Sequence, residues 1–476
     1  MRKTKIICTM GPSNRDTEVL KNLMLNGMNV ARLNFSHDTR EAHGKVIDQI
    51  KELREELDLP IGILLDTRGP EIRLGNFEHG KVHLKKGQHF TLTTAEILGN
   101  EERASISYKD LPKDMEVGSH VLIDDGRIEM ILESIVDCEL RCLVLTDGEI
   151  SDHKGINVPD AKLSMPYMSE EDRKDLIFGA QKGVDFIAAS FVRGPEDIDE
   201  MEEILKAHGG DEIKIIAKIE NRQGLDHLDE ILEKASGIMI ARGDLGVEIP
   251  LKEIPTIQKE IIKKAYDAGK IAITATQMLE SMIHAKRPTR AEANDVATAV
   301  YDGTSAIMLS GETAAGEYPV EALQTMAEIA EYTENHIDYE SCFLQAAKRD
   351  EVSVTAAISH ATCMTAIDIA AAGIITVTES GRTARTIAGY RPKCPILGCT
   401  PLEKTYQQMS LSWGVIPLQI PEKQTTEELF CEACEKAEEA GIINKEDTVV
   451  ITAGVPLGHS GTTNLIRVVS PGSSCR

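Results

Sequence analysis

A cation and an anion stand two residues apart at the end of an apolar run, in the segment IIAKIEN from Ile215 to Asn221. Side chains two apart on a strand point to the same face, so Lys218 and Glu220 would lie together. Such a pair can also be purely structural, because buried ion pairs shift pKa values without any function. The residues at the ends of the other predicted strands decide between these two interpretations.

Short apolar runs separated by helical patterns recur along the first two thirds of the chain. They predict strands at Lys5–Met10, Asn29–Asn34, Ile61–Leu65, Val184–Phe191, Ile213–Ile219, Gly237–Ala241, Ile271–Ala275 and Ser305–Leu309. They predict helices at Thr17–Asn26, Arg40–Leu57, Glu170–Lys182, Glu196–Ala207, Leu225–Lys234, Pro255–Ala268, Thr289–Tyr301 and Val320–Tyr332. Strands joined by crossover helices form parallel sheets, and eight such units favour an α/β fold of the (β/α)8 TIM-barrel type over an open sheet.

In a barrel of this kind, chemistry takes place at the C-terminal ends of the strands. The polar residues predicted there are Arg32, Asn34, Ser36, His37, Asp66, Thr67, Arg68, Glu71, Arg73, Lys218, Glu220, Arg242, Gly243, Asp244, Thr276, Gln277, Ser310 and Glu312. Solvent-exposed strand ends are polar in any barrel, so polarity alone proves little. The convergence of charges from several strands nevertheless favours a functional site around Lys218 and Glu220.

The residue types at these strand ends predict two kinds of cation site. Glu220 and Asp244 suit Mg²⁺, which is commonly held by one or two carboxylates with water and substrate oxygens. Gly243 beside them would let a ligand approach the backbone closely. A second set of residues combines uncharged oxygens with one carboxylate, and this mixture fits a weaker monovalent cation better than Mg²⁺. The set consists of Asn34, Ser36, Asp66 and Thr67.

Positive charge at the same end of the barrel predicts an anionic substrate. Arg32, Arg73 and Lys218 supply it in a chain that has 52 Lys and Arg against 77 Asp and Glu. Cations together with a divalent metal indicate phosphoryl transfer, in which catalysis is mostly positioning and charge neutralisation. The sequence has no Walker A motif. Composition and spacing therefore predict a metal-dependent barrel that acts on phosphates or enolates.

Two further segments predict additional domains. About 100 residues after Asp66 alternate and are rich in turns such as KKGQ and DDGR, which predicts an inserted small β-barrel domain that could act as a lid. After Asp338 the pattern restarts and predicts an open-sheet α/β domain. The predicted domains are the barrel (1–69 and 164–338), the inserted domain (70–163) and the C-terminal domain (339–476).

Composition excludes several classes of protein. A net charge of −25 argues against a nucleic-acid footprint. No apolar run approaches the roughly 18 residues of a spanning helix, so no membrane contact is expected. The ten cysteines lack zinc-ligand spacing, which predicts free thiols and a cytoplasmic location.

Eight motifs resemble those of pyruvate kinase: CTMGPS, VARLNFSH, LLDTRGPEIR, AKIEN, ARGDLG, TATQMLESM, RPTRAE and MLSGETAAGEYP. Their order and spacing match across almost the whole chain. The resemblance implies a barrel with an inserted lid domain and a C-terminal regulatory domain, assembled as a homotetramer. It also implies the glycolytic transfer of a phosphoryl group from phosphoenolpyruvate to ADP, giving pyruvate and ATP.

The resemblance further implies a role for each matching position. Lys218 would stabilise the phosphoryl group in flight and the enolate left behind, and a water near Thr276 would protonate that enolate. Substrate contacts would come from Arg32, Lys218, Gly243, Asp244 and Thr276. Mg²⁺, or Mn²⁺ in its place, would be held by Glu220 and Asp244, and K⁺ by Asn34, Ser36, Asp66 and Thr67. The nucleotide would contact Asn34, Phe35, Ser36, His37, Arg73 and Lys154.

Two positions within the resemblance carry separate predictions. A glutamate at the position of Glu71 accompanies potassium dependence in the family, where a lysine accompanies independence, so we expect potassium to activate the enzyme. Arg68 stands where lysine is common; it keeps the charge, and we expect little effect.

The segment TESGRTAR, Thr378 to Arg385, lies between a predicted strand and a predicted helix. Small hydroxyl and glycine residues at a helix N-terminus form a phosphate cradle, although a plain capped helix start has the same composition. In the family this loop and GHSGTTN, Gly458 to Asn464, border the effector site. A phosphorylated small-molecule effector is expected at Thr378, Ser380, Gly381, Arg382 and Thr383. Glu379 would place a negative charge inside the cradle, which puts fructose bisphosphate in doubt.

Two rival functions share some of these features. A Mg²⁺-dependent pyruvate-enolate aldolase on the same barrel would need neither the lid nor Lys154. A phosphometabolite-sensing scaffold would use the C-terminal loops and leave the barrel inert. The retention of Lys218, Glu220, Asp244 and Thr276 together argues against the scaffold.

Overall fold

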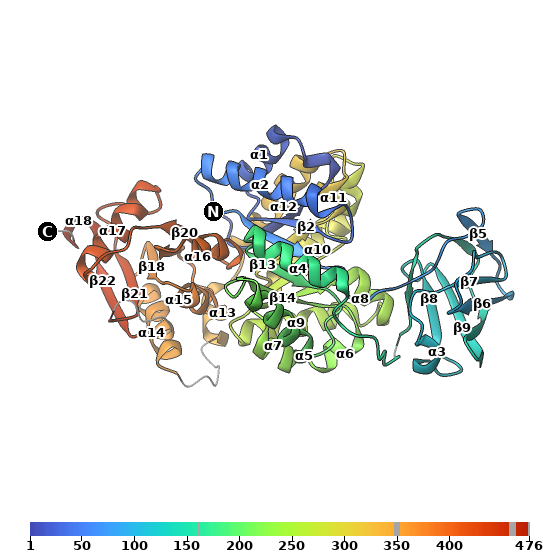
Figure 1. Cartoon of the computed structure of the whole chain (residues 1–476). Coiled ribbons are helices and arrows are strands. Elements are labelled where there is room, and N and C mark those ends of the chain that lie inside the picture. The colour runs from blue at the N-terminus through green and yellow to red at the C-terminus, as the bar shows by residue number, and fades with distance from the viewer. Residues whose placement is uncertain (160, 347–352, 457–462, 475–476) are drawn as a thin grey trace.

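Eight parallel strands close into a barrel at the centre of the molecule, between a β domain and an α/β domain (Figure 1). The computed structural model describes residues 1–159, 161–346, 353–456 and 463–474. Around the barrel the order is β1-β17-β16-β15-β14-β13-β3-β2. These strands are Lys5–Thr9 (β1), Val30–Asn34 (β2), Gly62–Asp66 (β3), Phe186–Ala189 (β13), Lys214–Ile219 (β14), Gly237–Ala241 (β15), Ile271–Ala275 (β16) and Ala306–Leu309 (β17). The predicted barrel is confirmed.

Helices surround this barrel and are positioned by local capping. Thr39 accepts a hydrogen bond from the backbone of Ala42 at the start of α2, and Thr289 with Glu292 forms a capping box at the start of α10. The main helices are Thr17–Leu25 (α1), Arg40–Glu56 (α2), Glu170–Lys182 (α4), Pro195–Ala207 (α5), Ile254–Asp267 (α9), Arg290–Tyr301 (α10) and Pro319–Glu334 (α12). No helix in the described ranges is long and apolar enough to cross a lipid bilayer.

Short helices at the strand ends differ from the sequence-based prediction. The helix predicted at Leu225–Lys234 is two helices, Arg222–Asp226 (α6) and Leu228–Lys234 (α7). The Asn221 side chain accepts a hydrogen bond from Gly224 N and starts α6 earlier than the apolar pattern does. Helices Arg242–Glu248 (α8) and Gly311–Ala314 (α11) were not predicted, because each is too short for an apolar period to be visible.

The inserted segment folds around a core of its own, with Phe90, Leu92, Val121 and Met130 among its buried residues. Its larger sheet has the order β4-β12-β8-β9-β10-β6-β7, and a bridge between Leu74 and Ile106 links the two ends of that order. The strands are Ile72–Arg73 (β4), His89–Thr93 (β6), Arg103–Ser105 (β7), His120–Ile123 (β8), Ile128–Val136 (β9), Glu139–Val144 (β10) and Gly155–Asn157 (β12). Lys81–Leu84 (β5) pairs with Gly148–Ser151 (β11), and Leu111–Asp114 forms α3.

The C-terminal domain lies on the other side of the barrel from the inserted domain (Figure 1). Its sheet has the order β20-β19-β18-β21-β22, parallel except for the last pair. The strands are Gly373–Val377 (β18), Ile396–Thr400 (β19), Val415–Gln419 (β20), Val449–Ala453 (β21) and Leu465–Val469 (β22). Its helices are Tyr339–Ala346 (α13), Val354–Asp368 (α14), Arg382–Ala388 (α15), Glu403–Gln408 (α16), Thr426–Glu439 (α17) and Pro471–Ser474 (α18). The open mixed sheet is as predicted, and the residue boundaries between the three domains stay predictions.

Charged side chains join the C-terminal domain to the N-terminal end of the barrel. Asp185, just before β13, lies 3.2 Å from the Arg54 guanidinium and 3.0 Å from Lys404 Nζ of α16. Lys404 also donates to the carbonyl of Val184, 2.5 Å away, and Lys5 donates to the carbonyl of Val415, 2.6 Å away. This junction leaves the opposite end of the barrel to the inserted domain.

Candidate active site

A cavity of about 570 Å³ lies between the C-terminal end of the barrel and the inserted domain. Both domains contribute to its walls. The predicted site residues that line it are Arg32, Asn34, Ser36, His37, Thr67, Arg73, Lys154, Lys218, Glu220 and Asp244. Residues predicted from separate strands are thus brought together at one place.

Lys218 is the buried centre of this site. Its Nζ donates to Ser190 Oγ at 2.7 Å and lies 3.0 Å from Glu220 Oε1 and 3.2 Å from Asp66 Oδ1. Burial opposes the ammonium charge, but the attraction of Asp66, Glu220 and Asp244 outweighs burial and raises the pKa of Lys218 above its usual value. Lys218 therefore stays charged although only 8% of it is exposed.

Asp66 neutralises two cations at the end of β3. Its Oδ2 lies 2.6 Å from Arg32 Nε, and its Oδ1 faces Lys218. Burial favours the protonated acid, yet Arg32 and Lys218 together hold the pKa of Asp66 below its usual value. Arg32 also donates to Thr9 Oγ1 at 3.0 Å, which fixes its guanidinium beside the cavity.

The two carboxylate oxygens of Glu220 face different partners. Its Oε2 accepts from Phe191 N at 2.6 Å, and Phe191 adopts a positive φ of 55° to direct that N–H. Its Oε1 is buried and faces the Lys218 ammonium at 3.0 Å. Burial raises the pKa of Glu220 to about 8; Lys218 opposes this rise and Asp244 adds to it. Glu220 and Asp244 both line the cavity, and two carboxylates in one cavity suit a bound divalent cation.

Gly243 and Thr276 lie beside Asp244 but do not line the cavity. Gly243 N donates to Thr276 Oγ1 at 2.8 Å, and that hydroxyl donates to the carbonyl of Ala275 at 2.6 Å. Arg242, also expected at a strand end, points away and pairs with Asp295 of α10 at 2.7 Å. Glu312 likewise has a structural role, since its carboxylate accepts from the backbone of Leu279 and of Ser310.

The predicted nucleotide contacts of the inserted domain are engaged within that domain and at its hinge. Arg73 Nε donates to Glu71 Oε2 at 2.8 Å and Arg73 Nη1 donates to the carbonyl of His153. Lys154 Nζ lies 2.7 Å from Asp124 Oδ1. Burial raises the pKa of the neighbouring Asp125, and the carboxylate of Asp244 across the cavity raises it further. The wall formed by the inserted domain therefore combines both signs of charge.

Two of the four predicted ligands of the monovalent cation, Asn34 and Thr67, accept hydrogen bonds from backbone N–H groups. Ser36 N donates to Asn34 Oδ1 at 3.1 Å, and Ser190 N donates to Thr67 Oγ1 at 3.1 Å. Asn34, Ser36 and Thr67 face the cavity, whereas Asp66 lies below it and faces two cations. The ring of Phe35 is buried in the barrel core against His43.

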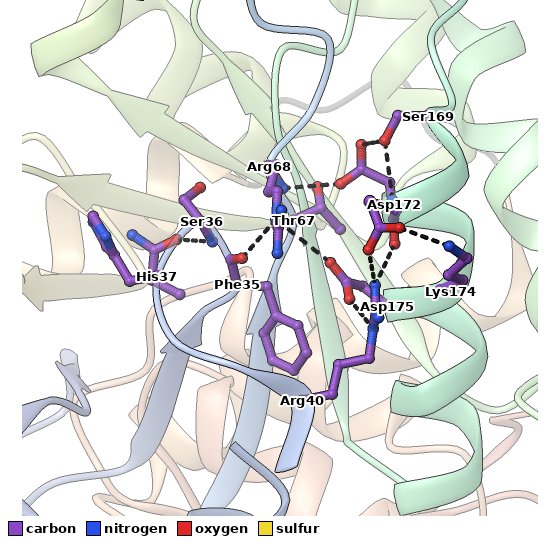
Figure 2. Close-up of polar contacts among 12 residues, drawn as sticks. Phe35, Ser36, His37, Arg40, Thr67, Arg68, Ser169, Asp172, Lys174 and Asp175 are labelled. Carbon is purple, nitrogen blue, oxygen red and sulfur yellow. Dashed lines mark hydrogen bonds and ion pairs between the residues drawn. The ribbon is translucent and has the colours of Figure 1, made fainter. Parts of the chain in front are cut away.

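Arg68 is held behind this segment by residues of α4 (Figure 2). Its Nε donates to the carbonyl of Phe35 at 2.8 Å, and its backbone N donates to Asp172 Oδ1 at 3.0 Å. Figure 2 shows Arg68 and Arg40 both directed at Asp175, with Arg40 Nε 2.5 Å and Arg68 Nε 3.8 Å from that carboxylate. Arg68 therefore shares the Asp175 carboxylate of α4 with Arg40, and it also lines the cavity.

The predicted effector loop lies in the C-terminal domain between β18 and α15. Gly381 adopts a left-handed φ of 69°, which allows the chain to turn into α15. Thr383 Oγ1 lies 2.8 Å from Thr463 Oγ1 and so joins the two predicted loops. Residues Gly458 to Thr462 of the second loop lie outside the described residues. No disulfide joins the nine cysteines in the described ranges.

Two residues of the site were missed by sequence reasoning. Ser190 follows β13 and contacts Lys218, and Asp125 lies in the turn DDGR of the inserted domain. The fourth predicted strand, Val184–Phe191, contains Ser190, so the sequence places Ser190 inside the strand and not among the polar residues at its end. Asp125 has the ordinary sequence signal of a turn, and only the fold brings it to the cavity.

These features define a barrel with a buried lysine and carboxylates in a cavity beneath an inserted domain, an arrangement typical of an enzyme. The family model described as the pyruvate kinase barrel domain matches residues 1–323, and the model of the pyruvate kinase alpha/beta domain matches residues 356–469. The chain belongs to the pyruvate kinase family. The aldolase alternative is not favoured by these matches.

Individual relatives give the same result over the full chain. A pyruvate kinase of Clostridium acetobutylicum is 47% identical over 98% of this chain and 99% of its own length. A pyruvate kinase of Geobacillus stearothermophilus is 48% identical, and the match covers 98% of this chain and 80% of the relative. The crystal structure of a pyruvate kinase from Cryptosporidium parvum superposes with a TM-score of 0.93 at 40% identity, covering 98% of this chain and 96% of that chain.

Proposed function

We propose that the cavity binds phosphoenolpyruvate and ADP and that Lys218 is the central catalytic group. The supporting observation is the ammonium of Lys218, which is buried, charged and fixed by three acceptors at the wall of the cavity. A fixed cation stabilises charge that develops on the transferring phosphoryl group and on the enolate oxygen. Arg32, held by Asp66 at the same wall, binds the substrate phosphate.

The donor set fits a divalent cation between Glu220 and Asp244. Glu220 and Asp244 both line the cavity, and carboxylate oxygens are the ligands with which proteins commonly hold Mg²⁺. When bound, the cation neutralises the carboxylate and phosphate of the substrate.

The substrate carbon is protonated near Thr276 in this proposal. Gly243 N and Thr276 Oγ1 are hydrogen bonded at 2.8 Å and adjoin Asp244, which lines the cavity; from there they would position the substrate and a water. ADP enters from the inserted domain, where Arg73 and Lys154 exchange their present partners, Glu71 and Asp124, for phosphate oxygens. Asn34, Ser36 and His37 complete the nucleotide wall, whereas Phe35 is buried and does not line the cavity.

A coupled assay for pyruvate and ATP from phosphoenolpyruvate and ADP tests this function directly. Phosphoryl transfer requires ADP, whereas an aldolase acting on the same enolate does not. ADP-dependent formation of pyruvate is the expected result. Pyruvate chemistry without a nucleotide requirement would contradict it.

Potassium activation is a separate part of the proposal. Asn34, Ser36, Asp66 and Thr67 supply oxygens of the type that hold a monovalent cation, and Glu71 lines the same cavity. In the structure Asp66 already faces Arg32 and Lys218, so a cation would share that carboxylate with them. We expect the rate to fall when potassium is replaced by a large organic cation at constant ionic strength, and an unchanged rate would refute the requirement.

Regulation and assembly are proposed from the family alone. Thr378, Ser380, Gly381, Arg382 and Thr383 would cradle the phosphate of a sugar phosphate or nucleotide monophosphate in a cytoplasmic, glycolytic homotetramer. Titration of such effectors at sub-saturating phosphoenolpyruvate tests the cradle, with activation expected. The absence of any response would remove the proposal.

A further inference from the structure

One arginine beside the active site has a set of contacts that the proposed chemistry does not use. Arg242 is the first residue of α8, its side chain is 11% exposed, and it does not line the substrate cavity. Its Nη2 donates to the carbonyl of Thr276 at 2.6 Å and its Nε donates to the carbonyl of Ala275 at 3.2 Å. One guanidinium therefore holds two consecutive carbonyls where β16 ends.

The turn that Arg242 holds has an unfavourable backbone. Thr276 has a φ of 68° and Gln277 a φ of 54°, so two successive non-glycine residues occupy the left-handed region. A β-branched residue such as threonine rarely adopts this conformation, and surrounding contacts must enforce it. The conformation places Thr276 Oγ1 where Gly243 N donates to it. Without Arg242, the two carbonyls would lose the contact that fixes the turn.

Asp295 holds Arg242 in turn. Its Oδ1 lies 2.7 Å from Arg242 Nη1, and its side chain is 33% exposed. Asp295 belongs to α10, which starts within the RPTRAE motif and is fixed by the capping box of Thr289 and Glu292. No catalytic role was assigned to that motif. Its helix supplies the counter-charge for the arginine that holds the active-site turn.

We infer that Arg242 and Asp295 form a positioning pair, which keeps the Thr276 turn in the geometry required to protonate the enolate. The inference rests on the proposed function, in which Thr276 acts near the substrate carbon. Neither residue touches the cavity, so the pair acts through Thr276 and not on substrate. Loosening the turn slows the step that depends on Thr276 more than it weakens substrate binding.

The variants Arg242→Lys and Asp295→Asn, alone and combined, test this pair in the full-length enzyme. Lysine keeps the charge but not the planar fork that reaches both carbonyls and Asp295. Four quantities are measured: the melting temperature, kcat, KM for phosphoenolpyruvate, and the rate at which pyruvate methyl protons exchange with ²H₂O. The exchange is followed by NMR in the presence of Mg²⁺, K⁺ and ATP. Exchange reports the reverse of the protonation step.

We expect Arg242→Lys to lower kcat by about 10- to 100-fold, because misplacing a catalytic group by about 1 Å costs up to about 10²-fold. KM should change by less than about 3-fold, and the exchange rate should fall at least as much as kcat. Asp295→Asn should show a smaller loss of the same kind. The double variant should be less impaired than the product of the single losses predicts, since both act through one turn.

Arg54→Lys is the matched control, because Arg54 is 9% exposed at its side chain and pairs with Asp185 at the other end of the barrel. It should leave kcat and exchange unchanged.

The variant Thr276→Ala separates the inference from the function on which it rests. An unchanged exchange rate in Thr276→Ala would show that Thr276 has no role in protonation. If Thr276→Ala slows exchange while Asp295→Asn and Arg242→Lys do not, the positioning pair is overturned. Should Arg242→Lys fail to fold, the milder Asp295→Asn decides.

Discussion

Two buried lysines lie at opposite ends of the barrel, and their surroundings differ in charge. Lys218 ends β14 at the cavity and is 8% exposed; Lys5 begins β1 at the junction with the C-terminal domain and is 6% exposed. The pKa of Lys218 is raised above its usual value, whereas burial lowers the pKa of Lys5 to about 7. Equal burial thus produces opposite protonation behaviour.

The neighbouring charges account for the difference. Lys218 has carboxylate oxygens of Glu220 and Asp66 at 3.0 and 3.2 Å. At an effective dielectric constant of about 20, each such contact is worth about 5 kcal/mol, which together exceeds the several kcal/mol needed to bury one ion. Lys5 has the carbonyl of Val415 at 2.6 Å, is repelled by Arg2 and is attracted only by Glu334. Carboxylates, and not exposure, decide whether a buried lysine keeps its charge.

The largest expected effect comes from removing the charged lysine. Lys218→Met should lower kcat by about 10³-fold or more, the scale of other single cations that stabilise phosphoryl transfer. The same substitution at the other end, Lys5→Met, should change kcat by less than about 2-fold. Steady-state assays of both variants at saturating substrates make the measurement.

Similar effects of Lys218→Met and Lys5→Met on kcat would contradict the conclusion that the two lysines differ in function. A Lys218→Met enzyme with a raised KM for phosphoenolpyruvate and an unchanged kcat would also contradict it, because Lys218 would then contribute to substrate binding alone.

The second effect concerns the carboxylates around Lys218. Glu220→Gln should raise the Mg²⁺ concentration for half-maximal activity by at least about 10-fold, since even outer partners of a metal site contribute about 10- to 100-fold. Glu312→Gln is the matched control: Glu312 is 1% exposed and also follows a strand, but its oxygens accept from backbone N–H groups. Magnesium titrations of activity should separate the two variants. An identical shift in both would show that Glu220 has no special place in the metal site.

Much of this arrangement could be predicted from the sequence, because parallel strands bring their C-terminal ends together whatever lies between them. The barrel strands and the pair Lys218 and Glu220 were predicted in this way, since period and spacing are local properties. Asp66 was assigned only to a monovalent cation, and its contacts with Arg32 and Lys218 needed coordinates.

Side-chain direction was the part that the sequence could not provide. Arg242 and Asp244 are two residues apart after the same strand, yet Asp244 faces the cavity and Arg242 faces α10. The reason is that α8 begins at Arg242, so a strand period no longer applies. The contribution of Asp125 depends on how the inserted domain meets the barrel, which no local pattern encodes.

A third, smaller effect should come from Ser190. Its hydroxyl accepts from Lys218 at 2.7 Å and donates to the carbonyl of Thr67 at 2.7 Å, and it is 1% exposed. A hydrogen bond to a charged group contributes about 1.5–3 kcal/mol, and Lys218 keeps its two carboxylates without it. Ser190→Ala should therefore lower kcat by about 10-fold, and Ser190→Thr should restore most of the loss.

Ser359→Ala is the control for removing a buried hydroxyl. Ser359 Oγ in α14 is buried and, within the described part of the chain, has no hydrogen-bond partner. This variant should retain full kcat. A Ser190→Ala enzyme as active as Ser359→Ala would show that the two carboxylates alone position Lys218.

The smallest effect concerns Lys5 and the pH dependence of stability. Between about pH 7 and the ordinary lysine value near 10.4, the unfolded chain binds a proton at Lys5 that the folded chain does not. The free energy of unfolding therefore rises with pH across this window, by at most about 1.4 kcal/mol per unit, whereas below it Lys5 is charged in both states and contributes no pH dependence. The melting temperature of the wild type minus that of Lys5→Met should increase from pH 7 to pH 9.5.

The variant Lys259→Met controls for general effects of pH, because the side chain of Lys259 is 73% exposed. A constant difference between wild type and Lys5→Met would mean that Lys5 stays charged in the folded protein, as Lys218 does.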